Sequence, residues 1–92
     1  MKITVWAVAK DLVDMAGSKF ESLDAAKAGP VANVTIQNTS SVAVYIENWN
    51  EATVDGSYVL SPDNQVEFVI NNLARLSFIT AWTNAAIRII TS

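Results

Sequence analysis

The chain has 92 residues, of which 51% are hydrophobic and only 16% charged, and its formal net charge is −3. It contains no Cys and no His, which excludes disulfides, thiolate metal sites and the Ser-His-Asp and Cys-His forms of nucleophilic catalysis. The acidic balance and the scattered basic residues argue against nucleic acid as a partner. No apolar run approaches the length that a bilayer requires, so we expect no membrane partner either.

The first residues predict a short strand followed by helix. Residues 3–6 are β-branched and aromatic, which favours a strand. From Ala7 onward, apolar residues recur at three- and four-residue steps, a spacing typical of an amphipathic helix. The residues that carry this spacing are Val8, Leu12, Met15 and Ala16.

A second helical piece is predicted just before a break in the chain. Ser22 is a plausible N-cap for residues 23–28, and Gly29 suits the position just after a helix end. Gly29-Pro30 is a pair that interrupts regular structure. We therefore divide the chain into a helix-leaning arm, residues 1–29, and a β-domain, residues 30–92.

The β-domain shows alternation of apolar and polar residues between closely spaced turns. Residues 34–37, 42–47 and 65–70 alternate in this way, as expected of half-buried strands. Asp55-Gly56 predicts a type I′ hairpin turn, and the segment 61–64, with Pro at its second position, predicts a type I turn. The last two strands are expected over 75–81 and 86–91.

These elements predict a mainly β protein. Strands this close along the chain leave no room for crossover helices, so the sheets should be antiparallel. We expect a small antiparallel β-sandwich or barrel of about six to seven short strands over residues 31–92, with a short N-terminal strand and a helical segment over residues 1–28.

Catalytic chemistry finds little support in the residue types. Paired carboxylates could hydrolyse glycosides. The candidates are Glu47, Glu51, Asp55 and Glu67. We interpret them as solvated turn and strand charges, because nothing else marks a sugar cleft. We expect no enzyme, no metal and no cofactor.

Aromatic side chains are the better candidates for a site. Three tryptophans are many for so small a chain, and Trp49 lies in a polar turn between Asn48 and Asn50. Such residues serve as core plugs or as interface anchors. The low charge of the β-domain also suits a surface covered by other protein. Our hypothetical partner interface consists of Trp6, Tyr45, Trp49 and Trp82.

Four segments carry a resemblance to a family type: "VANVTIQNTSSVAVYI", "GSYVLSPDNQVEFVI", "LSFITAW" and "AAIRIITS". They resemble the small accessory virion proteins of tailed bacteriophages, such as head-decoration and head-fibre-anchoring proteins. One departure is Asp63 after Pro62, where Gly is frequent in such domains. The resemblance covers residues 31–92.

The resemblance implies a non-enzymatic structural protein located in the virion. Its partners would be copies of itself, with a trimer favoured, and the major capsid protein or another virion protein. The alternative is a soluble binding module, either a phage-encoded inhibitor of a host protein or a carbohydrate-binding β-sandwich. A small glycosidase-like enzyme ranks last.

Overall fold

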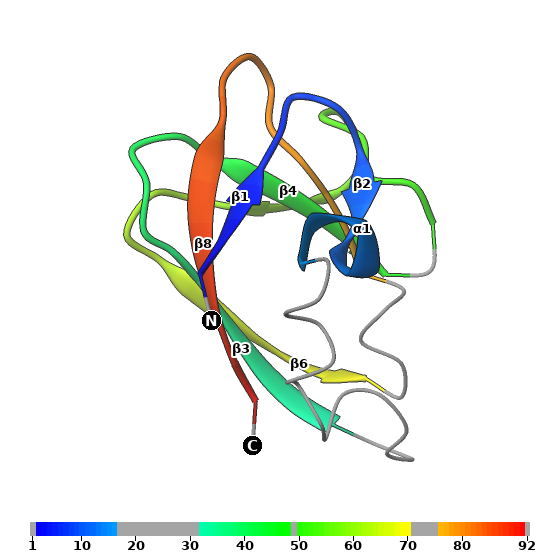
Figure 1. Ribbon diagram of the computed structural model, residues 1–92, viewed down its shortest axis with the longest axis vertical. Helices are drawn as coiled ribbons and strands as arrows, with labels where there is room; N and C mark the ends of the chain where they lie inside the picture. Colours follow the sequence, from blue (N-terminus) through cyan, green and yellow to red (C-terminus); the bar gives the residue numbers. More distant parts are fainter. Residues whose placement is uncertain (1, 17–31, 49, 71–75, 92) are drawn as a thin grey trace.

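The computed structural model describes residues 2–16, 32–48, 50–70 and 76–91 (Figure 1). Within them the chain forms eight strands and one short helix. In chain order these are β1 (Lys2–Val5), β2 (Lys10–Asp11), α1 (Leu12–Ala16), β3 (Ala32–Asn38), β4 (Val44–Asn48), β5 (Tyr58–Leu60), β6 (Gln65–Ile70), β7 (Leu76–Ile79) and β8 (Ala85–Thr91).

The strands form two four-stranded sheets. Sheet A has the order β1-β8-β3-β6, and sheet B has the order β2-β7-β4-β5. All of these neighbouring strands run antiparallel. The expectation of a mainly β fold with antiparallel sheets is therefore confirmed, and six of the strands come from the predicted β-domain.

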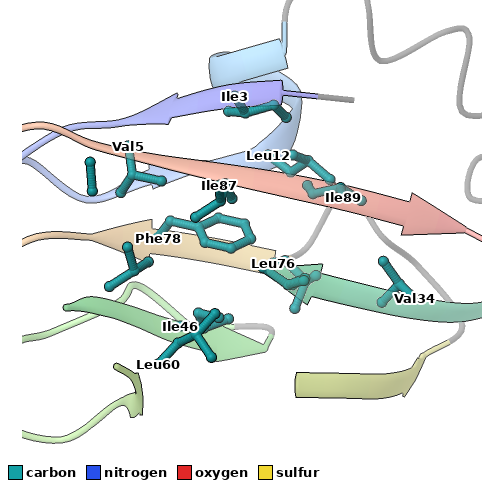
Figure 2. Packing of buried hydrophobic residues seen from close by; sticks show 13 residues of the cluster. Ile3, Val5, Leu12, Val34, Ile46, Leu60, Leu76, Phe78, Ile87 and Ile89 are labelled. Carbon is teal, nitrogen blue, oxygen red and sulfur yellow. The ribbon is translucent and has the colours of Figure 1, made fainter. Parts of the chain in front are cut away.

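A single apolar core draws side chains from both sheets. In β3 and β4 the apolar members of the alternation are buried, and the polar residues between them lie on the opposite face. Figure 2 shows Phe78 of sheet B turned toward Ile87 of sheet A. The buried cluster consists of Ile3, Val5, Leu12, Val34, Ile36, Val44, Ile46, Leu60, Leu76, Phe78, Ala85, Ile87 and Ile89.

The described part of the predicted arm is built into both sheets. β1 pairs with β8 along its whole length, and β2 pairs with β7. Ile3, Val5 and Leu12 belong to the shared core. The boundary that we predict at residues 29 and 30 lies outside the described residues, as does the predicted helix over 23–28.

The predicted helix from Ala7 onward is wrong for its first half. The chain after β1 forms a loop and the short strand β2, and among the described residues only the five of α1 are helical. The apolar spacing was misleading because Val8 is 64% exposed whereas Leu12 is fully buried, so the two do not share a buried face. No helix in the described part of the chain has the length and apolar character needed to span a bilayer.

The Asp55-Gly56 turn also differs from the prediction. Neither central residue of this turn has a left-handed φ. Asp63 is the only described non-glycine residue with a positive φ, which excludes Asp55, and the φ of Gly56 lies outside the left-handed region. A type I′ turn needs positive φ at both central positions, so this is a different turn. The Thr53 hydroxyl accepts a hydrogen bond from the Gly56 N–H at 3.1 Å. Moreover, β5 pairs with β4, not with residues 52–54.

The turn at Pro62 forms, but as a different type. The Asn64 N–H donates to the Ser61 carbonyl at 3.1 Å, which closes the four-residue turn. Asp63 has φ of 64°, a left-handed value. A type I turn has negative φ at this third position and a type II turn has positive φ, so the predicted type I turn is wrong.

Candidate functional site

Two of the predicted interface residues, Trp6 and Trp82, come together at one end of the molecule. Trp6 follows β1, and Trp82 lies in the connection that leads into β8, the strand that pairs with β1. The Thr80 N–H donates to the Trp6 carbonyl at 3.0 Å, so the two connections lie side by side (Figure 1). The Thr80 hydroxyl donates to the Thr83 carbonyl and so closes the turn that carries Trp82.

Large apolar side chains are exposed at this end. Trp82 is 77% exposed, Trp6 44% and Val8 64%. We call these three residues the tryptophan end. Covering both rings would remove on the order of 200 Å² of apolar surface from water, worth about 5 kcal/mol before the costs of association. A patch of this kind marks an interaction site more often than a lone exposed residue does.

The two connections that carry the tryptophan end contain no charged residue. Residues 3–9 and 76–87, which include both connections, contain no Asp, Glu, Lys or Arg. A partner that covers only these connections removes no ion from water, which is the most expensive part of forming an interface. The polar groups that remain are hydroxyls, the Asn84 amide and the backbone. Charged residues begin at Lys10, which lines an acidic depression together with Ala9.

Tyr45 lies on the outer face of sheet B, close to the same end. Its strand neighbours Val44 and Ile46 are buried in the core, so Tyr45 points to the other face. It is directly opposite Val59 on β5 and Ile79 on β7. These three residues form an apolar row across sheet B. Ile79, at one end of the row, is followed in the chain by Thr80, whose N–H donates to the Trp6 carbonyl.

The remaining interface candidate, Trp49, lies outside the described residues. The described residues contain further exposed large apolar side chains that the predicted interface did not include: Val8, Val54, Tyr58, Val59, Val69 and Ile90. Val8 was assigned to the apolar side of a helix, although it lies in the β1–β2 connection. Val59 had a weak signal, since it alternates with the buried Leu60 on a strand.

A second feature is an open depression of about 250 Å³ at the β3 and β6 end, lined by Gln37, Asn38, Thr39, Asp63, Asn64 and Gln65. Three of its four side-chain amides are engaged within the protein. The Gln37 side chain donates to the Gln65 side chain at 3.0 Å, and all polar groups of the Asn38 side chain bond to neighbouring segments. The Thr39 hydroxyl donates to the Ala86 carbonyl at 3.2 Å, so most of the lining side chains already bond within the protein.

The predicted carboxylates do not come together as one cluster. Glu47 accepts a hydrogen bond from the Ser57 hydroxyl at 3.1 Å, and Asp55 lies in the turn described above. Glu51 lines an open depression of about 320 Å³ together with Asp11 and Asp14. Glu67 lies on β6 in the other sheet.

The described residues contain no group of three or more acidic side chains placed to hold a metal ion. Comparisons with protein-family models, with curated proteins and with solved structures found no match for this chain.

Proposed function

We propose that this chain is a small β-sandwich that acts as a structural protein of a virion and is present in many copies on the capsid. The observation that carries the proposal is the tryptophan end, where two indole rings and Val8 are exposed on connections that contain no charged residue. Such a surface suits an anchor on a larger protein shell. The resemblance of residues 31–92 to accessory virion proteins points in the same direction.

A small anchor is sufficient when many copies bind one shell. Each copy would gain a few kcal/mol from its own contact. Linked copies then bind with a raised effective concentration, so a modest patch gives firm attachment. Self-association of the chain, with a trimer favoured, would supply this linkage.

Mass spectrometry of purified particles tests the proposal directly. The particles are those of the virus whose genome encodes this chain. We expect the chain at high copy number in intact particles and at much reduced copy number in particles assembled with a Trp6→Ala, Trp82→Ala variant. Absence of the unmodified chain from particles would end the proposal.

A carbohydrate-binding module is the second candidate, favoured by the same two exposed indoles, because flat aromatic faces also stack on sugar rings. The two functions separate in a binding experiment on the soluble protein. Titration with oligosaccharides would change the tryptophan fluorescence of the protein, and much less so that of Trp82→Ala, only if sugar is the ligand. Under the first proposal, the change appears on addition of capsid protein and not on addition of sugar.

A further inference from the structure

In the part of the chain that the structure describes, sheet A ends in two strands that each have a pairing partner on one side only. Within the described residues, β1 pairs only with β8, and β6 pairs only with β3. An edge strand carries a row of backbone N–H and C=O groups that can pair with another chain. Such edges are usually protected by charge, proline or a bulge. β6 has one charged residue, Glu67, and beside it Val69 is 67% exposed.

The hydrogen bonds that are present determine which residues face each open edge. The Asn38 N–H donates to the Asn64 carbonyl at 2.9 Å, which extends the register of β3 with β6. Since bonded and non-bonded pairs alternate along an antiparallel ladder, Val66 and Phe68 bond to β3. The backbone groups of Gln65, Glu67 and Val69 therefore face the open side.

The same reasoning applies to β1. The Thr39 N–H donates to the Ala86 carbonyl at 3.1 Å, in register with the pairing of β3 and β8. The even-numbered residues of β8 therefore bond to β3, and Ile87 bonds to Ile3 of β1. The backbone groups of Lys2 and Thr4 then face the open side of β1.

The two open edges match each other residue by residue. When β6 of one copy lies antiparallel to β1 of the next, one register places Glu67 opposite Lys2, Val66 opposite Ile3 and Gln65 opposite Thr4. The pairs are then acid with base, apolar with apolar and polar with polar. Glu67 and Lys2 are both exposed on the outer face, and Ile3 and Val66 both contact the core.

An unfavourable contact within one copy supports this register. Lys2 lies directly opposite Arg88 on the neighbouring strand, and like charges at such a position repel. A carboxylate arriving next to Lys2 would offset that repulsion. By contrast, the twofold pairing of β6 with β6 that uses all three outward-facing residues would place one Glu67 opposite the other.

We infer that copies of this chain join head to tail, the β6 edge of one copy adding to the β1 edge of the next with Glu67 opposite Lys2. This contact uses two different surfaces, so it generates a ring when the rotation closes. The inference rests on the proposed function, because the head-to-tail contact specifies how the proposed self-association occurs. A ring of three copies is one closed assembly that this contact can form.

Charge exchange in the full-length chain tests the pairing. In Glu67→Lys and in Lys2→Glu, two like charges face each other, and we expect the apparent dissociation constant of the oligomer to rise about tenfold per contact, measured by sedimentation. The double variant Lys2→Glu, Glu67→Lys restores opposite charges and should restore assembly. Lys2→Glu also relieves the repulsion from Arg88, so lost assembly in that variant does not arise from misfolding. Unchanged assembly in both single variants would overturn the inference.

Cysteine cross-linking distinguishes the possible partners, since the chain has no Cys of its own. Opposed residues in a bonded antiparallel pair have Cα atoms about 5.5 Å apart, a spacing that suits a disulfide. In Lys2→Cys, Glu67→Cys we expect a covalent ladder that ends at the ring size, and no cross-link in either single variant. Cross-linked dimers of Glu67→Cys alone, or a monomer throughout, would overturn the head-to-tail contact. Particles that contain the chain while these tests fail would leave the proposed function standing.

Discussion

The Asn38 side-chain amide donates a hydrogen bond to the Leu60 carbonyl at 2.9 Å, and this bond connects β3 of sheet A to β5 of sheet B. Asn38 is 1% exposed. Its amide also donates to the Val42 carbonyl at 2.7 Å, and its side-chain oxygen accepts from the N–H and the hydroxyl of Ser40. One buried residue thus holds three segments in place, and all its polar groups have partners.

Replacing Asn38 should destabilise the fold well beyond the average substitution. Asn38→Asp keeps the shape but replaces the two N–H donors with a buried carboxylate beside two carbonyls. We expect a loss of about 3 kcal/mol or more in the free energy of unfolding, measured by urea titration at pH 7. Asn84→Asp, the same change at an exposed residue, is the control and should cost less than about 0.5 kcal/mol. Equal stability of the two variants would contradict the role of Asn38.

The turn at Pro62 gives a second prediction, because Asp63 has φ of 64°. Alanine is strained at such a φ, whereas glycine is not. We expect Asp63→Ala to lower the free energy of unfolding by about 1 kcal/mol and Asp63→Gly to leave it equal or raise it. Thermal unfolding shows which of the two variants is more stable. If Asp63→Ala were the more stable one, the turn would not contain a left-handed residue.

Gly56 provides the opposite case. Its φ is not left-handed, and a Cβ there would meet only the Thr53 hydroxyl oxygen, at 3.2 Å. The strain is small and is offset by the reduced freedom of the unfolded chain. We expect Gly56→Ala to change the free energy of unfolding by less than about 0.5 kcal/mol. A loss of 1 kcal/mol or more would instead fit the type I′ turn that the sequence suggested.

The two turns show what the sequence can and cannot predict. The positions of both turns were correct, because Gly, Pro and Asp mark them locally. Their types were not. At Pro62 a distant atom takes part, since the Asp63 N–H donates to the Asn38 carbonyl at 3.0 Å, across 25 positions of the chain. At Asp55-Gly56 the Thr53 hydroxyl, only three positions from Gly56, accepts from its N–H in place of a hairpin bond. Alternating strands such as β3 and β6 were equally predictable, because one face of each is buried.

The tryptophan end was predictable only as a set of residue types. Trp6 and Trp82 become neighbours through the pairing of β1 with β8, near opposite ends of the sequence. Periodicity within a short window contains no information about such a pairing. The spacing from Val8 to Leu12 even suggested a helix in place of this exposed connection.

The last prediction separates exposed from buried aromatic residues. Trp82 is 77% exposed and makes little contact with the core, so Trp82→Ala should change the free energy of unfolding by less than about 1 kcal/mol. Phe78 is fully buried, and Phe78→Ala should cost about 3–5 kcal/mol. Urea titration gives both values. Under the proposed function, the unmodified chain pellets with capsid shells, and in the same preparations this pelleting should be lost for Trp82→Ala although the protein is folded. Normal pelleting of this variant would show that the shell binds another surface, and a large loss of stability would show that Trp82 supports the core.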